Sequence, residues 1–172
     1  QAKALRAMDD CIRRLRGTLD NLVDVTGLET GRMKFIHKNY DFLEVVRRAL
    51  ETHETPIAEK KLEVVTELPR GPLPAFGDPE RLGRAIGQLV DNATKFSPEG
   101  TKIGVAVEAN ESTYAVLVAD SGPGVPNELW ESIFEPFRQV DGSTTRAHGG
   151  VGVGLAIARR VARGHGGDVR VH

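Results

Sequence analysis

The sequence has one cysteine, Cys11, and no apolar run long enough to cross a membrane, which takes about 18 residues. A single cysteine excludes a disulfide within the chain and is typical of a reducing compartment. The chain begins with a polar, helix-like pattern, so no signal peptide is expected. We therefore expect a cytoplasmic protein segment, and whether a longer parent protein is membrane-anchored stays open.

The chain also lacks a strong charge of one sign, because its formal net charge is only −1. Nothing in this balance points to a nucleic-acid partner. Two common phosphate-binding signatures are missing as well. No G-x-x-x-x-G-K-[ST] string occurs, and the glycine-rich stretch that is present follows a polar loop, not the buried strand of a dinucleotide-binding unit.

Glycine is abundant instead, and four glycines fall within the six positions 149–154. Each glycine inside a regular element costs about 0.5–1 kcal/mol relative to alanine, so a packed core disfavours such a run. Glycine-rich turns let backbone N–H groups surround a phosphate, and the helix predicted to follow would point its positive end at the same place. Taken alone, the pattern fits a flexible hinge or a helix stop equally well.

Residues 1–30 are predicted to form one long helix. Its apolar residues recur at alternating spacings of three and four, namely Leu5, Met8, Ile12, Leu15, Leu19 and Leu22. Such a seam is typical of a helix that packs in a bundle or against a second copy of the chain. A helix folded back on its own domain is the alternative.

The remaining residues, 34–172, alternate between helix and strand patterns. Helices are predicted over 42–59, with Asp41 and Glu44 as a capping box, over 79–96 after the N-cap Asp78, and over 155–163. Strands are predicted over 62–68, 103–107, 114–118 and 168–172, the middle pair as an antiparallel hairpin. We expect an α+β fold, a two-layer sandwich with a mixed, mostly antiparallel sheet, preceded by the long bundle-forming helix.

One face of the predicted helix from Pro79 carries Gln88, Asn92 and Lys95, spaced four and three residues apart. Asparagine is unfavourable in mid-helix, so its presence suggests a role. An amide oxygen suits Mg²⁺ beside phosphates, and a lysine can neutralise phosphate charge. A solvated polar face is the alternative.

Asp120 ends a predicted strand and begins the pattern D-x-G-x-G with Gly122 and Gly124. A carboxylate at this place can accept a hydrogen bond from a ligand's amino group, and the glycines let a flat ring approach. An ordinary turn with an aspartate cap explains the same residues.

Four segments in this order resemble the catalytic, ATP-binding domain of sensor histidine kinases of two-component systems, in the Hsp90-like ATPase/kinase superfamily. The family's N, G1, F and G2 boxes are similar to residues 87–98, 120–124, 133–137 and 149–155, and His165-Gly166-Gly167 follows as usual. Residues 1–33 resemble the second helix of the dimerisation and histidine-phosphotransfer hairpin, which leaves 34–172 as the catalytic domain.

The resemblance implies ATP and Mg²⁺ as ligands and residues 138–149 as a mobile lid. It places catalytic roles at Gln88 and Asn92, with Mg²⁺ held by Asn92. The implied nucleotide-binding residues are Asn92, Lys95, Asp120, Gly122, Gly124, Phe134, Phe137, Gly150, Gly152, Gly154 and Leu155. Among these, Lys95 would contact phosphate, Asp120 would accept from the adenine amino group, and both phenylalanines would pack at the root of the lid.

Gln88 bears on the type of reaction. ATPases of the superfamily place a water-activating glutamate here, and a neutral glutamine cannot act as a general base. The sequence therefore favours phosphotransfer over hydrolysis. The family usually has a second asparagine at this position, and Val151 and Val153 also depart from its G2 box. Val151 removes a hydrogen bond to phosphate that a hydroxyl residue would offer, and whether Gln88 and Val151 weaken ATP binding stays open at this point.

The chain contains no phospho-acceptor histidine in the family's context. His53-Glu54-Thr55-Pro56 imitates the acceptor motif but lies on the helix that leads into the catalytic domain, so we interpret it as a coincidence. The chain is then expected to be part of a larger kinase. The expected partners are an acceptor hairpin outside this chain, a response regulator receiver domain, and a second copy in a homodimer.

Two other classes of function stay open at this point. A non-enzymatic signalling module with a degenerate nucleotide site would act by partner binding, and Gln88, Val151 and the missing acceptor favour it. An ATPase or a serine kinase of the same superfamily is the third reading. The missing glutamate disfavours the ATPase, and the long N-terminal helix disfavours the small serine kinases.

Overall fold

A computed structural model describes residues 33–138 and 152–172. The predicted helix over 1–30, Gly150 and nearly all of the implied lid lie outside the described residues, so what the sequence predicts for them stays a prediction.

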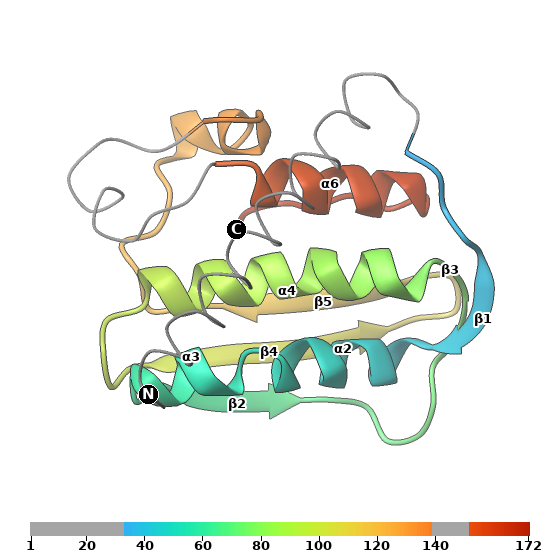
Figure 1. Ribbon diagram of the computed structural model, residues 1–172, viewed down its shortest axis with the longest axis horizontal. Helices are drawn as coiled ribbons and strands as arrows, with labels where there is room; N and C mark the ends of the chain where they lie inside the picture. Colours follow the sequence, from blue (N-terminus) through green and yellow to red (C-terminus); the bar gives the residue numbers. More distant parts are fainter. Residues whose placement is uncertain (1–32, 139–151) are drawn as a thin grey trace, which may run out of the picture.

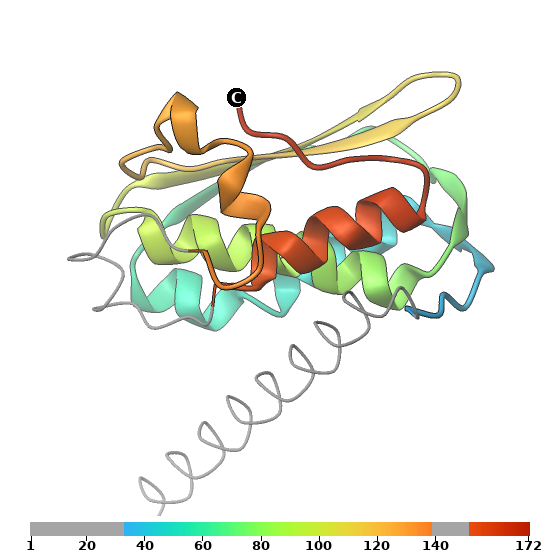
Figure 2. The ribbon, with the colours of Figure 1, turned by 90° about the horizontal axis from the view of Figure 1, so that it is seen from above.

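The domain has two layers, with helices packed on one face of a sheet (Figures 1 and 2). The sheet has the order β2 (Glu63–Glu67), β4 (Lys102–Ala109), β5 (Tyr114–Ala119). β2 and β4 are parallel, whereas β4 and β5 form the expected antiparallel hairpin around Asn110. The helices are α2 (Phe42–Glu51), α3 (Glu54–Glu59), α4 (Pro79–Phe96) and α6 (Gly154–Gly164). The α+β sandwich with a mixed sheet is confirmed.

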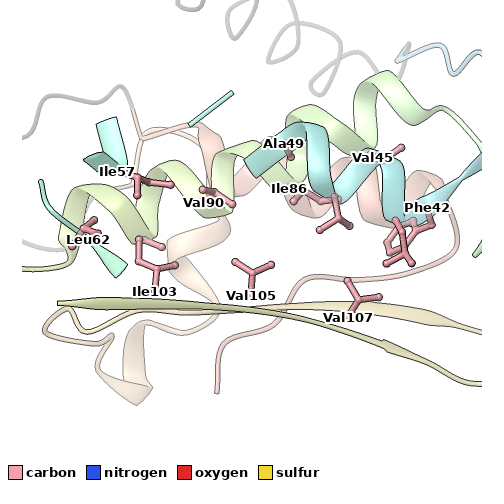
Figure 3. Close-up of a cluster of buried hydrophobic side chains, with 13 residues drawn as sticks. Phe42, Val45, Ala49, Ile57, Leu62, Ile86, Val90, Ile103, Val105 and Val107 are labelled. Atoms are coloured by element: carbon pink, nitrogen blue, oxygen red, sulfur yellow. The ribbon is translucent and has the colours of Figure 1, made fainter. Parts of the chain in front are cut away.

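The core lies between the sheet and the helices α2 and α4 (Figure 3). Alternate residues of β4 point inward, so Ile103 and Val105 are almost fully buried. Leu43 of α2 and Val90 of α4 are fully buried above them. Burying each such side chain contributes about 1.5–3 kcal/mol, and this packing fixes α4 on the sheet.

A second apolar cluster joins α4 to α6. Ala85 of α4 packs with Ile157, Ala158 and Val161 of α6, and the incoming segment adds Phe35 to the cluster. The two helices therefore lie side by side, as both views show (Figures 1 and 2). This contact brings the first residues of α6 against the middle of α4.

The single helix predicted over 42–59 is wrong, because the chain breaks between α2 and α3. Pro56 has no N–H to donate to the carbonyl of Thr52, and its ring disfavours a continuous helix there. The Thr52 hydroxyl and His53 Nδ1 both bond the Ala49 carbonyl oxygen, at 2.8 and 2.7 Å, and so close the end of α2. Side-chain bonds of this kind compete with the helical ladder.

Asp41 caps α2 as predicted, but the reciprocal half of the capping box is wrong. The Asp41 carboxylate accepts from the N–H of Leu43 at 3.0 Å. Glu44 pairs instead with Arg48 one turn later, at 2.8 Å. Asp41 also accepts from the N–H of Leu73 at 2.9 Å. This contact spans 32 residues, so no local sequence pattern predicts it.

A second small sheet was not predicted from the sequence. β1 (Lys38–Asp41) pairs antiparallel with β3 (Pro74–Gly77). Both strands are short and one begins at a proline, so alternation over them is too brief to recognise. The small sheet joins the segment that leads into α2 to the segment that leads into α4.

Residues 168–172 do not form the predicted strand. The N–H of Val169 donates to the Asp168 carboxylate at 3.0 Å, and side-chain bonds from Arg159 and Arg163 hold the same carboxylate. Polar contacts to α6, and no ladder of backbone bonds, therefore position this segment.

Replacing Asp78 with asparagine is expected to destabilise the domain by about 1–3 kcal/mol at neutral pH. Asp78 is 5% exposed and caps α4. Its Oδ1 accepts from Arg81 N–H at 3.0 Å and its Oδ2 from Ile36 N–H at 2.8 Å. An asparagine amide keeps one acceptor oxygen, so one of these donors would lose its partner.

The pKa of Asp78 determines how its contribution to stability changes with pH. Burial raises the pKa of Asp78, but the donors Ile36 and Arg81 outweigh it and hold the pKa below the ordinary 3.8. The stability from Asp78 is thus present above about pH 3.8 and lost as the pH falls through the lower folded pKa. Urea unfolding should show wild type and variant converging at acid pH.

Asp41→Asn is the matched control for Asp78→Asn. One oxygen of Asp41, Oδ1, accepts both of its bonds, so an amide oxygen can replace it. We expect a loss well below that of Asp78→Asn. Equal losses for the two variants, with equal pH profiles, would contradict the two-oxygen explanation.

Candidate functional site

The middle of α4 meets the start of α6 at Gln88. A Cβ atom built on Gly154 would collide with the Gln88 side-chain oxygen and would lie 3.2 Å from its Cδ. Gln88 therefore packs directly against the first residue of α6, and only glycine leaves it room. The structure thus brings Gln88 and Gly154 together, although 66 positions separate them in the sequence.

Asn92 lies one turn further along α4 on the same side as Gln88. Its side chain is half-buried. Among the hydrogen bonds and ion pairs of the described residues, none engages its amide. A half-buried amide without a protein partner is available to a ligand.

Lys95 is also on α4, but the structure gives it a partner that the sequence analysis did not consider. Its ammonium group lies 2.5 Å from the carboxylate of Asp91, one turn back. Both side chains are about one-third exposed. A phosphate at Lys95 would have to compete with Asp91 for the same charge.

The aspartate-glycine loop lies at the far end of α4. The Asp120 side chain accepts from the N–H of Gly122 at 2.7 Å through Oδ1, which leaves Oδ2 open. A Cβ atom on Gly122 would lie 2.6 Å from that carboxylate and 3.1 Å from the carbonyl oxygen of Phe96, the last residue of α4. Gly124 has a φ of +72°, which glycine adopts readily.

A second loop joins the site from the segment 126–138, which contains the short 3₁₀ helices η1 (Asn127–Leu129) and η2 (Ser132–Phe134). Phe134 is buried, whereas Phe137 is 56% exposed and has a φ of +65°. The N–H of Phe137 donates to the carbonyl oxygen of Gly152 at 2.9 Å. This bond ties the loop to the glycine-rich stretch, and Gly152 itself has a φ of +74°.

The helix α6 begins without a side-chain cap. Its N-cap residue is Val153, which makes no capping hydrogen bond. The first N–H groups of α6, at Gly154 and Leu155, thus have no intrahelical acceptor and carry the positive end of the helix dipole. An anion at this place would satisfy them.

These parts form one line along α4. Gln88 and the start of α6 lie at one end, and Phe96 with the Gly122 turn lies at the other, about 12 Å away at the helical rise per residue. Asn92 lies midway. The arrangement offers donors and an amide oxygen for phosphate and metal at one end, and a glycine-lined carboxylate for a base at the other.

Residues 77–172 match the model of the family described as histidine kinase-, DNA gyrase B- and HSP90-like ATPases. The chain belongs to this ATPase family. A hybrid signal transduction histidine kinase D from Dictyostelium discoideum is 38% identical over 93% of this chain and 11% of its own length. The solved structure of the mycobacterial sensor histidine kinase MprB covers 78% of this chain and 84% of its own, with 32% identity and a TM-score of 0.67.

Full-length ShkA, solved in complex with AMPPNP, is 27% identical over 90% of this chain and 34% of its own, with a TM-score of 0.69. Within the ATPase family, these matches identify the described domain as the catalytic ATP-binding domain of a histidine kinase. Because the chain spans about a tenth of the Dictyostelium relative and a third of ShkA, the whole protein's activity and partners are proposals.

The metal-binding side chains at the site suit Mg²⁺ that arrives with a nucleotide better than Mg²⁺ bound by the protein alone. In the described part of the chain, no cluster of histidine, cysteine, aspartate or glutamate could hold a metal ion. Mg²⁺ in ATP sites takes few protein ligands and completes its shell with phosphates and water. The unengaged amide of Asn92 suits that arrangement in this ATPase-family domain.

Sequence reasoning missed one residue that shapes the site. Lys60, at the end of α3, donates to the carbonyl oxygens of Thr94, Lys95 and Ser97, each at 2.8 Å. It thereby caps the last turn of α4, where the helix dipole is negative. No local pattern signals a contact across 34 residues.

The structure does not favour His53 as a phospho-acceptor. His53 lies in the groove between α2 and α4, with Cε1 3.1 Å from a Cβ built on Gly87. Its Nδ1 is occupied by the carbonyl oxygen of Ala49. These contacts close the end of α2 at the break before α3, and they explain the position of His53 without a role as a phospho-acceptor.

None of the helices among residues 33–138 and 152–172 combines the length and apolar character that a membrane crossing needs.

Proposed function

We propose that this ATP-binding domain binds Mg²⁺ with ATP and transfers the γ-phosphoryl group to a histidine outside the chain, for relay to a response regulator. The observation that carries the proposal is the contact of Gln88 with Gly154 at the uncapped start of α6, with Asn92 one turn further along α4. Neutral amides and backbone N–H groups are suited to position a triphosphate without activating water.

Each group would have a distinct task. Asn92 would hold Mg²⁺, which neutralises charge on the β- and γ-phosphates. The N–H groups of Gly154 and Leu155 would hold phosphate oxygens, Asp120 would accept from the adenine amino group through Oδ2, and Gly122 and Gly124 would leave space for the ring. Lys95 would exchange Asp91 for phosphate when the nucleotide binds.

The transfer is an in-line displacement at phosphorus. A bond forms between an imidazole nitrogen and the γ-phosphorus, the bond to the β–γ bridging oxygen breaks, and ADP leaves with that electron pair. The chain supplies positioning and charge neutralisation. Gln88 cannot remove a proton from water, which favours transfer over hydrolysis.

We also propose the wider context that the sequence suggested. Residues 1–33 would be half of a dimerisation and phosphotransfer hairpin, residues 34–172 the catalytic domain, and the parent protein a homodimer with its kinase part in the cytoplasm. The acceptor histidine would lie on the other hairpin helix, which is not in this chain.

A second candidate is a signalling module that acts by partner binding without catalysis. The ion pair of Lys95 with Asp91 favours it, because the cation expected to bind phosphate already has a partner. Gln88 and Val151 favour it as well, since both depart from the usual site.

Calorimetric titration with AMPPNP, with and without Mg²⁺, separates the two candidates. We expect a Kd in the micromolar range with Mg²⁺ and at least about tenfold weaker binding without it, a difference of 1.4 kcal/mol or more. The guanine analogue is the control for base recognition. Absence of heat in every titration would contradict the kinase proposal and favour the partner-binding module.

A further inference from the structure

Arg159 joins three separate segments at the outer side of α6. Its side chain is 14% exposed, which is low for an arginine on a helix surface. It lies about one and a half turns after Gly154, the residue that contacts Gln88. Neither the family's boxes nor the periodicity of α6 singles it out.

The guanidinium group of Arg159 binds two carboxylates. Nη1 donates to Glu131 Oε2 at 2.8 Å, and Nε donates to Asp168 Oδ1 at 2.9 Å. Nη2 donates to the other Asp168 oxygen at 3.4 Å, so Asp168 is held by the fork. The guanidinium group also lies over the ring of Phe134, with 4.5 Å from its central carbon to the ring centroid.

The pKa values of Arg159, Asp168 and Glu131 are all shifted in the direction that favours their charged forms. The hydrogen bonds that Arg159 donates to Asp168 and Glu131 raise the pKa of Arg159, and the bond from Arg159 holds the pKa of Asp168 well below its usual range. The same arginine lowers the pKa of Glu131. All three groups therefore stay ionised throughout the neutral range, and the cluster does not switch with pH there.

Two of these contacts lie on the loop that carries the F box. Glu131 precedes η2, Phe134 is its last residue, and the chain continues to Phe137, whose N–H donates to the carbonyl oxygen of Gly152. The loop is thus tied to α6 twice, by Arg159 at the helix surface and by Phe137 just before the helix start. Movement at the first tie would be transmitted to the second.

We propose that Arg159 is a positioning residue for the nucleotide site, because it holds η2 and the residues up to Phe137 at a fixed place relative to Gly152 and the start of α6. This rests on the proposed function, since it assigns the purpose of the clamp to nucleotide binding. Lysine cannot replace it fully, because an ammonium group lacks the fork that reaches both carboxylates.

Arg163 provides the matched control. It lies one turn further on the same helix and donates to the same Asp168 carboxylate at 3.1 Å. Its side chain is 54% exposed, and among the described residues it forms an ion pair with Asp168 alone. Arg163→Gln removes an ion pair from Asp168 without touching the loop, so it measures what a surface contact contributes.

The loop also contains a reporter. Trp130, the only tryptophan of the chain, is half-buried beside Glu131, and its indole N–H donates to the carbonyl of Val125 at 2.9 Å. Quenching of its fluorescence by acrylamide measures the exposure of the loop without any nucleotide. This readout separates failure of the clamp from failure of the proposed function.

The experiment compares Arg159→Gln, Arg159→Lys, Arg163→Gln and Glu131→Gln. We expect Arg159→Gln to increase quenching of Trp130 and to raise the Kd for AMPPNP by about tenfold, as loss of a charge-assisted contact implies. Arg159→Lys should recover part of both effects, and Arg163→Gln should leave both near wild type. In a double-mutant cycle, Glu131→Gln should add little to Arg159→Gln.

Two results would overturn the inference. Equal effects of Arg159→Gln and Arg163→Gln on both readouts would make the clamp an ordinary surface ion pair. Increased quenching with an unchanged Kd would show that the clamp fixes the loop but does not position the nucleotide site. If wild type itself bound no nucleotide, the proposed function would fail, and the quenching series would still decide whether Arg159 fixes the loop.

Discussion

Asn92→Ala is expected to abolish metal-dependent nucleotide binding, with a Kd for AMPPNP about 100-fold higher than wild type in the presence of Mg²⁺. The amide has no protein partner among the described residues, so its removal takes away a ligand contact and leaves no donor or acceptor unpaired. Loss of one bond to a charged group costs about 1.5–3 kcal/mol, which corresponds to roughly 10- to 160-fold in affinity, and metal coordination places the effect at the upper end.

The metal dependence distinguishes this role from general damage. Wild type and Asn92→Ala should bind AMPPNP about equally weakly without Mg²⁺, whereas only wild type should gain affinity when the metal is added. Asn127→Ala, an exposed asparagine in η1, is the matched control and should behave as wild type. A variant that keeps the gain from Mg²⁺ would remove Asn92 from the metal site.

Gly122→Ala is expected to give the second-largest effect, a loss of about 30-fold or more in affinity for the adenine nucleotide. The added Cβ would lie 2.6 Å from the Asp120 carboxylate and 3.1 Å from the Phe96 carbonyl oxygen. The backbone at Phe96 ends α4 and cannot move freely, so the carboxylate and its turn must shift. Displacing the group proposed to accept from adenine removes a charge-assisted bond and shifts the ring's position, together about 2 kcal/mol.

Gly83→Ala is the control, because it makes the same chemical change on the same domain. A Cβ on Gly83 would meet only a methyl group of Val45, at an ordinary 3.5 Å. Within a helix, alanine is favoured over glycine by about 0.5–1 kcal/mol, so this variant should be slightly more stable and bind normally. Thermal unfolding measured beside the titrations separates binding from stability. Equal Kd values for both variants would contradict the proposed base pocket.

Local signals predicted the elements that carry the site. Asp78 followed by Pro79 marked the start of α4, and the glycine-rich stretch marked the start of α6, because caps and glycines act over a few residues. The hairpin around Asn110 was equally clear, since its side chain accepts from Ser112 and Thr113 at 3.0 and 2.8 Å. Such signals depend on neighbours in the sequence.

What the sequence did not predict depends on partners distant along the chain. Lys60 caps α4 across 34 residues, and Arg159 reaches Glu131 across 28. The strand predicted over 168–172 is wrong for the same reason, because Arg159 and Arg163 of α6 hydrogen-bond the Asp168 side chain. The pairing of Lys95 with Asp91 is local, at one helical turn, and the spacing of four residues is one at which opposite charges on a helix attract each other.

The parallel pairing of β2 with β4 also has a consequence for folding. Parallel neighbours cannot be joined by a tight turn, and the connection between these two strands contains β3 and the whole of α4. We therefore expect the parallel pair of β2 and β4 to form together with α4, whereas the β4–β5 hairpin can close by itself. The amide hydrogens of Val90 and of the β2 residues that bond β4 should consequently exchange in one cooperative unit, at the slow limit set by global unfolding. The helix that carries Gln88 and Asn92 would then resist local unfolding as strongly as the sheet does. The conformational flexibility needed for nucleotide exchange would have to come from the loops around it.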